Sequence, residues 1–451
     1  MSIKNLNHEP VWDAVGIGAG PFNLGFAALA SSVKDLKVLV LESADELAWH
    51  PGMMLDGAHL QVPFMADLVT MADPTNPLSF LNHLKETGRI YPFYIRENFY
   101  PLREEYNNYL RWAAAKLPSV RFGHHVAAAR HADGIYELDV HTAEGAHTVR
   151  TRKLVLGTGT VPYVPASVPQ HLLAAGQVVH SSGYREASER ISASGRIAVV
   201  GSGQSAAEIF ADLLGRLPAD GQLEWVTRSA RFFPLEYTKL TLEMTSPEYI
   251  DHFHGLPQGT RDRLSASQKG LYKGINADLI DEIHELLYRR SVAGQAPVTL
   301  RAATALESVE TCNDSLSLGL RNQDDGGGFT THADTLVLAT GYGYREPDFL
   351  AGIEHRLNRL PDGRLDVDRD YAIALEGDVL VQNAELHTHG FTAPDLGMGA
   401  YRNSVIINRL LGRAHYRVET RIGFQHFGSP AAGTRPAHSP DLDLHPEGAH
   451  A

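Results

Sequence analysis

The chain alternates between short apolar runs and longer stretches in which apolar and polar residues mix with a helical period. Continuous apolar runs are typical of strands buried on both faces of a parallel sheet, and their alternation with helices indicates an α/β fold. The expected strands, some of which run on into tight turns, lie within 12–17, 37–41, 153–159, 196–200, 222–226 and 335–342. The expected helices include 24–30, 205–214 and 277–290.

A glycine-rich turn, Gly18 to Asn23, joins the first expected strand to the first expected helix. Gly18 and Gly20 have no Cβ, so backbone N–H groups at the helix N-terminus can approach a phosphate closely. Pro21 stands at the start of the helix, and Asn23 replaces the third glycine of the usual fingerprint. Glu42 ends the next strand, where an acidic side chain is expected to bind a ribose hydroxyl. This order predicts a dinucleotide site rather than an ordinary tight turn.

A second glycine-rich turn follows the expected strand 196–200 and opens another helix. Its residues Gly201, Gly203, Gln204 and Ser205 are predicted to hold a second dinucleotide in the same way. The next strand ends near Arg228 and Arg231, where the first unit has Glu42. A guanidinium pairs with a 2′-phosphate that a carboxylate would repel, so we expect NADP(H) rather than NAD(H). A solvated surface position is the alternative for either arginine.

Cysteine content and charge narrow the chemistry further. Cys312 is the only cysteine among 451 residues, which excludes an intramolecular disulfide and a Cys-x-x-Cys redox pair. Electrons are therefore expected to pass through a bound cofactor. A formal net charge of −13 argues against a nucleic-acid partner. The histidines near the C-terminus lack the regular spacing of a metal site, and we expect no metal.

The lengths of the hydrophobic runs also indicate where in the cell the protein is expected. None reaches the roughly 18 uncharged apolar residues that a membrane helix requires, and residues 1–10 are polar without a signal-like apolar region. We therefore expect a cytoplasmic protein with no membrane span. We also expect a homo-oligomer, either a dimer or a tetramer.

The order of elements predicts two Rossmann-like dinucleotide-binding domains, with the second inserted in the first. Two similar strand-and-turn segments, 153–159 and 335–342, bracket the second glycine-rich unit and place the insertion there. The predicted division is 11–190 with 335–425 for the first nucleotide domain, 191–235 with 293–334 for the second, 236–292 for a smaller helical substrate-binding region, and 426–451 for a disordered tail.

A polar, aromatic and proline-rich loop at 60–77 follows the first nucleotide unit, and such loops commonly supply positioned polar groups. With this loop the chain resembles the flavin-dependent N-hydroxylating monooxygenases of siderophore synthesis, the lysine and ornithine N-hydroxylase family. The segments that carry the resemblance are 18–23, 61–76, 201–208, 339–342 and 385–399. They extend over nearly the whole chain, so the resemblance applies to it as a unit.

The resemblance implies FAD at the first glycine-rich turn, NADPH at the second, and O2 as co-substrate. NADPH would reduce the flavin, and one oxygen atom of O2 would pass to a primary amine. Gln61 would lie beside the flavin and the nicotinamide as the residue closest to catalysis, where its amide both donates and accepts hydrogen bonds. Further cofactor contacts are expected from Thr340, Gly341, Leu396 and Gly397. We interpret His387 and His389 as packing groups rather than as bases.

The loop also bears on the choice of amine. Lysine and ornithine hydroxylases carry a lysine in the pattern Phe-Leu-Lys-Asp-Leu-Val, and that lysine pairs with the substrate carboxylate. Ala66 takes its place here, and a lost buried charge partner costs about 2–5 kcal/mol. We therefore expect an aliphatic diamine, putrescine or cadaverine. Candidates to contact the part of the substrate remote from the reacting amine are Asp67, Glu236, Glu243 and Asn276.

Other interpretations stay open. Lys239 or Lys273 could replace the missing lysine, which would restore lysine or ornithine as the substrate. The segment 180–184 resembles the identifying motif of flavin monooxygenases that act on sulfur or ketones. A non-catalytic NADP sensor is a further alternative. Comparing NADPH consumption in the presence of amines with that in the presence of ketones discriminates between an N-hydroxylase and a sulfur or ketone monooxygenase.

Overall fold

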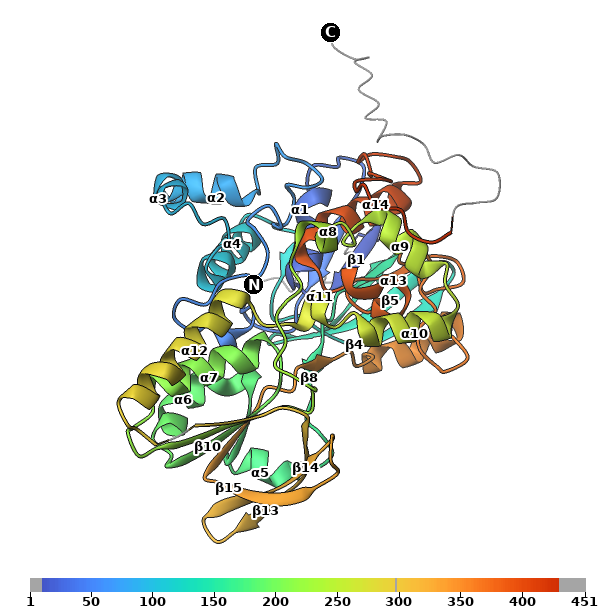
Figure 1. Cartoon of the computed structure of the whole chain (residues 1–451). Helices are drawn as coiled ribbons and strands as arrows, with labels where there is room; N and C mark the ends of the chain where they lie inside the picture. The colour runs from blue at the N-terminus through green and yellow to red at the C-terminus, as the bar shows by residue number, and fades with distance from the viewer. Residues whose placement is uncertain (1–9, 297, 430–451) are drawn as a thin grey trace.

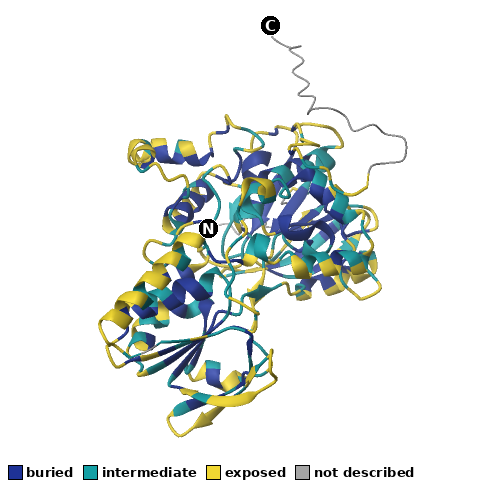
Figure 2. Cartoon of the chain, viewed as in Figure 1, coloured by how far each residue is buried: buried dark blue, intermediate teal, exposed yellow. Residues whose placement is uncertain are grey.

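The computed structural model describes residues 10–296 and 298–429, which form two lobes (Figure 1). Each lobe contains a five-stranded sheet whose neighbouring strands are all parallel. The inner strands consist largely of buried Val, Leu and Ile (Figure 2), as expected for sheets covered on both faces. The predicted α/β class with two parallel sheets is confirmed. Of the predicted tail 426–451, residues 430–451 lie outside the described residues.

The first lobe holds the first glycine-rich turn. Its sheet has the order β18-β7-β1-β2-β3, formed by Val379–Val381, Leu154–Leu156, Ala14–Ile17, Val38–Leu41 and Val120–Arg121. One face packs on α1, α4 and α14, which are Pro21–Ala30, Arg103–Ala115 and Gly399–Leu411. The other face packs on the antiparallel strands β4, β5 and β6 and on η4, which are His125–Ala132, Ile135–Thr142, Gly145–Thr151 and Asp348–Arg356.

The second lobe holds the second glycine-rich turn. Its sheet has the order β12-β11-β10-β16-β9, formed by Thr299–Arg301, Gln222–Val226, Arg196–Val200, Thr335–Leu338 and Val178–His180. One face packs on α6, α7 and α12, which are Tyr184–Ser192, Gln204–Arg216 and Ala277–Val292. The other face packs on α5 and on the antiparallel strands β13, β14 and β15, which are Gln170–Ala174, Thr304–Cys312, Ser315–Asn322 and Gly328–Ala333.

The chain first leaves the first lobe and finally returns to it at one place. There β8, Val161–Pro162, pairs with β17, Tyr342–Gly343, in a two-stranded antiparallel sheet. The second lobe is thus inserted in the first, but the predicted boundaries at 190 and 335 are wrong for two strands. Both β9 and β16 belong to the second sheet, because β16 pairs with β10 and with β9.

The helical segment predicted as one region at 236–292 is shared between the lobes. Its helices α8 to α11 are Lys239–Leu242, Pro247–His254, Gln258–Ser267 and Gly270–Lys273, and α12 follows. In the first lobe α9 and α10 pack against α13, Leu386–His389, and η5, Gly390–Thr392, whereas α12 packs on α7 in the second (Figure 1). The segment therefore spans the junction of the lobes.

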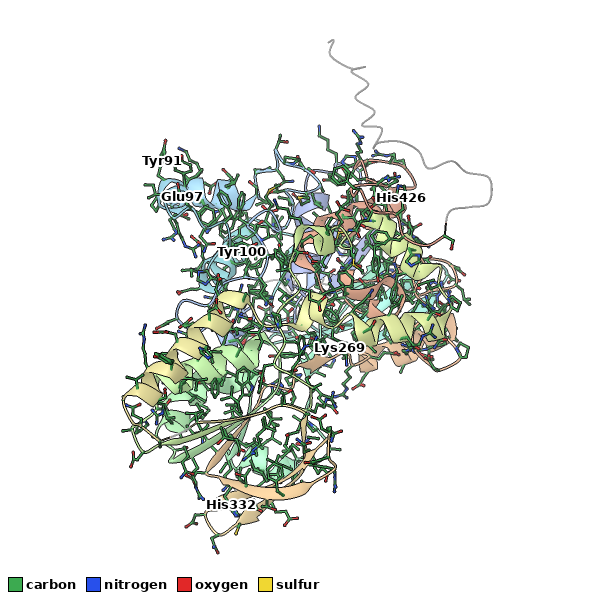
Figure 3. The ribbon with its side chains drawn as sticks, in the orientation of Figure 1. Tyr91, Glu97, Tyr100, Lys269, His332 and His426 are labelled. Atoms are coloured by element: carbon green, nitrogen blue, oxygen red, sulfur yellow. The ribbon has the colours of Figure 1, made fainter. Side chains whose placement is uncertain are left out.

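The short remaining elements complete the first lobe and the junction. They are α2, Phe80–Glu86; α3, Ile90–Ile95; η2, Pro51–Met53; η3, Ser181–Gly183; and η6, Leu396–Met398. Helices α2 and α3 project from the first lobe, and Tyr91 lies on this projection (Figure 3). Within 10–296 and 298–429, no helix is long and apolar enough to cross a membrane.

Candidate active site

A large cleft between the lobes is lined by both glycine-rich turns. Its volume of about 2220 Å³ exceeds the roughly 300–1,000 Å³ typical of small-ligand pockets, so it has room for more than one cofactor. The carboxyl ends of β1 and β2 reach it from the first lobe, and those of β10 and β11 from the second. Open α/β sheets bind their ligands at such strand ends.

The first turn presents bare backbone to this cleft. Gly18 has a φ of +90°, and a Cβ added there would lie 2.4 Å from the carbonyl oxygen of Gly157, so the position requires glycine. An added Cβ on Gly20 would meet nothing within 4 Å, and Pro21 begins α1 directly after it. Open backbone at a helix N-terminus fits a phosphate group.

Glu42 lies at the edge of the cleft beside this turn, directly after β2. Its Oε2 accepts a hydrogen bond from the backbone N–H of Ala19 at 2.8 Å, and its Oε1 accepts one from Ala44 at 2.9 Å. The carboxylate is therefore held in place next to the phosphate turn. This is the position expected for a ribose-binding acid.

Asn23 faces away from the cleft and is fully buried behind the turn. Its Nδ2 donates to the carbonyl oxygens of Ile17, Gly18 and Val155. Its Oδ1 accepts a hydrogen bond from Gln382 Nε2 at 2.7 Å. Asn23 thus ties the ends of β1, β7 and β18 together, and the structure does not support its prediction as a direct cofactor contact.

The second turn repeats the design of the first. Gly201 has a φ of +154°, and an added Cβ would lie 2.2 Å from the carbonyl oxygen of Ala339. The indole N–H of Trp225 donates to the Gly201 carbonyl at 2.8 Å and fixes the turn. Gly203 precedes α7, whose first residues, Gln204 and Ser205, line the cleft. This end of α7 fits a second phosphate group.

Three cations line the cleft near the second turn: Arg228, Lys269 and Lys273. Lys269 lies where the lobes meet (Figure 3). Partial removal from water, together with the charges of Lys269 and Arg228, lowers the pKa of Lys273. An added Cβ on Gly203 would lie 3.3 Å from the carbonyl oxygen of Lys273, so this residue borders the second turn. Mutually repelling cations suit an anionic ligand such as a 2′-phosphate; Arg231 does not line the cleft.

Gln61 lies at the cleft wall between the lobes. Its Nε2 donates to Gln204 Oε1 at 3.2 Å and to the carbonyl oxygen of Gly274 at 3.4 Å. The side chain of Gln204 is therefore engaged by protein groups although it also lines the cleft. Both hydrogens of the Gln61 amide are used, so the group offers its oxygen to the cleft.

Thr340 and Gly341 line the cleft where the chain returns to the first lobe. The hydroxyl of Thr340 donates to the carbonyl oxygen of Tyr163 at 2.5 Å, and the carbonyl oxygen of Gly341 is hydrogen-bonded to His180 Nε2 at 3.1 Å. These bonds connect the two chain passages, so the side chain of Thr340 supports the wall of the cleft rather than pointing a free donor into it.

Leu396 lines the cleft, whereas Gly397 and Ala66, which lie next to each other, do not. A Cβ added to Gly397 would lie 3.0 Å from Asp395 Oδ1 and 4.0 Å from the Cβ of Ala66. Asp395 also lines the cleft, caps η6 through the Gly397 N–H at 2.6 Å, and was not predicted from the sequence. Burial raises the pKa of its carboxyl group. Its position directly before Leu396, in a segment already singled out, was the available signal.

The four residues proposed from the sequence to contact the substrate do not line the cleft. Asp67 is buried and accepts hydrogen bonds from its own loop and from the Phe80 N–H. Glu243 Oε2 accepts from the backbone of 424–425. Glu236 is exposed, and Asn276 caps α12 through the Asp278 N–H at 2.8 Å. These residues are close in sequence to residues that line the cleft, but their side chains point elsewhere.

His50 is a second cleft residue that was not predicted from the sequence. It has a left-handed φ of 49°, which is uncommon outside glycine. Its ring makes edge contacts with Trp49 and Tyr342 at centroid distances of 4.8 and 5.9 Å. A strained residue at a cleft is a candidate for function, but no sequence pattern marks a strained φ at a histidine.

Residues 10–344 match the family described as L-lysine 6-monooxygenase/L-ornithine 5-monooxygenase. This match covers well over half of the chain, and the chain belongs to that family.

Individual relatives narrow the comparison. The chain is 47% identical over 422 residues to a putrescine N-hydroxylase of Shewanella oneidensis, covering 92% of this chain and 84% of the relative. The FAD-bound crystal structure of a cadaverine monooxygenase from the desferrioxamine pathway of Erwinia amylovora matches with a TM-score of 0.91 and 45% identity, covering 94% of this chain and all of that one. An ornithine N-hydroxylase of Kutzneria, with reduced FAD, NADP+ and L-ornithine, matches with a TM-score of 0.83 and 28% identity over 89% and 99% of the two chains.

Proposed function

We propose that this chain is an FAD-dependent monooxygenase that uses NADPH and O2 to hydroxylate one amino group of an aliphatic diamine for siderophore biosynthesis. Putrescine and cadaverine are the proposed substrates, which are the diamines named for the relatives at 47% and 45% identity. The observation that carries the proposal is local: an added Cβ on Gly397 would lie 3.0 Å from Asp395 Oδ1 and 4.0 Å from the Ala66 Cβ, so a carboxylate and an alanine, rather than a lysine, lie together next to Leu396 at the cleft.

The two turns divide the cofactors between the lobes. FAD is assigned to the first turn, where Glu42 stands beside open backbone at α1. NADPH is assigned to the second turn, where Arg228, Lys269 and Lys273 offer positive charge to a 2′-phosphate. The proposal assigns Lys273 to the nucleotide rather than to a substrate carboxylate, and Lys239, the other candidate to replace the missing lysine, does not line the cleft. Bound FAD supplies the redox and oxygen chemistry, and the protein supplies orientation and a shielded site.

Asp395 is the group proposed to receive the distal ammonium of the diamine. Burial raises its pKa, and a bound cation would favour its ionised form. The reacting amine has to be neutral, although a free alkylamine has a pKa near 10.4. One carboxylate at one end of the cleft therefore holds the charged amine there and leaves the other amine to lose its proton in an apolar environment.

Gln61 is proposed as the protein group nearest to the reacting centre. Its oxygen is free to accept a hydrogen bond from a cofactor, because both amide hydrogens are bound to Gln204 and Gly274. The aliphatic wall at Leu396 would exclude water from the same region. As part of this proposal the protein is a cytoplasmic homo-oligomer, which light scattering and cell fractionation test.

Product analysis tests the proposal. Purified protein is loaded with FAD and supplied with NADPH, O2 and one of putrescine, cadaverine, ornithine or lysine. We expect a mono-N-hydroxylated diamine and at least about tenfold lower kcat/KM with both amino acids, equivalent to about 1.4 kcal/mol. Preferred hydroxylation of lysine or ornithine would overturn the substrate assignment. A protein that binds no FAD would overturn the reaction.

A further inference from the structure

An ion pair joins the two lobes beside the cleft. Arg103 in α4 of the first lobe donates to both oxygens of Glu208 in α7 of the second, at 2.9 and 2.8 Å. The side chains are only 12% and 7% exposed. Arg103 also donates to the carbonyl oxygen of Met53 at 2.7 Å, so it ties α4, α7 and η2 together.

The pair continues as a hydrogen-bonded chain to Gln61. Glu208 Oε1 accepts from Gln204 Nε2 at 3.0 Å, and Gln204 Oε1 accepts from Gln61 Nε2 at 3.2 Å. Two backbone groups join from the segment between α11 and α12. The Asn276 N–H donates to Gln204 Oε1 at 2.8 Å, and the Gly274 carbonyl accepts from Gln61 at 3.4 Å.

The direction of this chain follows from groups that have only one hydrogen-bonding role. A guanidinium and a backbone N–H only donate, whereas a carboxylate and a carbonyl oxygen only accept. Because Glu208 accepts, Gln204 turns its NH2 group toward it and its oxygen toward Gln61. Gln61 must then donate to Gln204, which leaves its own oxygen for the cleft.

We propose that Arg103 and Glu208 are positioning residues for the hydroxylation: through Gln204 they orient the Gln61 amide so that the cleft receives a hydrogen-bond acceptor. The inference rests on the proposed function, because it concerns the cofactor side of the same cleft.

The first test removes the acceptor-only group at one end of the hydrogen-bonded chain while keeping the size of the side chain at position 208. In Glu208→Gln an amide replaces the carboxylate and can itself donate, so one of the two groups that fix the orientation of Gln204 is lost and only the Asn276 N–H still favours it. We expect hydroxylated product per NADPH consumed to fall at least threefold, with kcat for the diamine falling more than KM rises. Arg103→Lys keeps the charge but loses the planar two-bond geometry, so an intermediate loss is expected.

A matched control comes from another ion pair. Arg356 and Asp378 lie 2.8 Å apart in the first lobe with exposures of 12% and 13%, and neither lines the cleft. Asp378→Asn and Glu208→Gln should both lower the thermal unfolding midpoint of the apoprotein, but Asp378→Asn should leave product per NADPH unchanged. An equal loss of product per NADPH in both variants would mean that the Arg103–Glu208 pair acts only through stability, and would overturn the proposal.

A second test does not depend on hydroxylation. The dissociation constant of NADP+ is measured for Glu208→Gln, Gln61→Met and the double variant. If Glu208 acts through Gln61, the double variant should bind NADP+ about as tightly as the single variant that binds NADP+ more weakly. If the change in the NADP+ dissociation constant of the double variant equals the product of the two single changes, the two residues act independently and the proposal is overturned. Failure of the wild type to hydroxylate any diamine would overturn only the proposed function.

Discussion

Glu385 and Arg402 form an ion pair in the interior of the first lobe, with 3.1 Å between Oε1 and NH1 and exposures of 0% and 1%. The Arg402 guanidinium also lies 4.6 Å from the ring centroid of Phe22, which belongs to the first glycine-rich turn. A buried charge without its partner is strongly unfavourable. The pair therefore ties the segment 385–399 and α14 to the first nucleotide site.

Replacing Arg402 should destabilise the protein severely. Arg402→Met leaves Glu385 buried without a counter-charge, and we expect a loss of about 3–5 kcal/mol in the free energy of unfolding. Urea denaturation of the apoprotein measures it. Arg413→Met is the control, because Arg413 and Asp35 form an exposed pair that should contribute less than about 1 kcal/mol. Similar losses in both variants would contradict the importance of the buried pair.

Ala66→Lys should move substrate preference toward amino acids. Ala66 lies near Gly397, where an added Cβ would be 4.0 Å from the Ala66 Cβ, and a lysine there would offer an ammonium partner to a substrate carboxylate. We expect kcat/KM for lysine or ornithine, relative to putrescine, to rise at least about tenfold, or about 1.4 kcal/mol. Ala66→Met adds length without charge and should lower all activities without this shift. An unchanged preference in the lysine variant would remove Ala66 from the explanation of specificity.

Asp395→Asn should weaken diamine binding selectively. The variant keeps an oxygen to cap η6 but loses the charge proposed to hold the ammonium. We expect KM for putrescine to rise about 10- to 30-fold, equivalent to about 1.4–2 kcal/mol, while KM for NADPH changes little. Asp362 also lines the cleft but is paired with Arg364, so Asp362→Asn should leave both constants unchanged. Steady-state kinetics with each substrate varied in turn provide the comparison.

Arg228→Ala should reduce discrimination between the two nicotinamide cofactors. We expect KM for NADPH to rise far more than KM for NADH, because only NADPH carries the 2′-phosphate that a guanidinium pairs with. Arg231→Ala is the matched control, since Arg231 does not line the cleft. Equal effects of Arg228→Ala on both cofactors would exclude Arg228 from the phosphate site.

His389 should make stability fall on acidification. Burial holds the pKa of this ring well below its usual value, so the folded protein keeps it neutral. The unfolded chain takes up the proton near pH 6.5, so the free energy of unfolding decreases as pH falls below that value, by up to about 1.36 kcal/mol per pH unit. His389→Gln should reduce this slope between pH 6.5 and 5 by the share of one proton, while other buried histidines such as His50 and His387 keep their contributions. Exposed His332 is the control, and His332→Gln should leave the slope unchanged (Figure 3).

Local patterns were sufficient for much of the fold. The strands 196–200 and 222–226 appear with the predicted bounds, because uninterrupted apolar runs flanked by turn residues leave few alternatives. The assignment of β9 and β16 to the first domain failed for a different reason. Both strands look like their neighbours in sequence, and only pairing with β10 over long separations places them in the second sheet.

The site was predictable where backbone chemistry determines it and not where side-chain direction does. Gly18, Gly20, Gly201 and Gly203 occupy the two turns as expected, and at Gly18 and Gly201 a positive φ and a carbonyl oxygen close to any added Cβ require glycine. Glu243 was proposed from closeness in sequence, yet its carboxylate binds backbone N–H groups of 424–425. Asp395 was missed because nothing before folding shows that it and Ala66 flank the same glycine.

The antiparallel contact between β8 and β17 brings the two ends of the inserted segment together. Pro162 lies opposite Tyr342, so the chain departs from the first lobe and rejoins it at adjacent points. A short loop across that gap would leave the order of the first sheet unchanged. Such a replacement would also remove α9 and α10, which pack on α13 and η5, so the second lobe and this helical cover of the first lobe have to be inherited together.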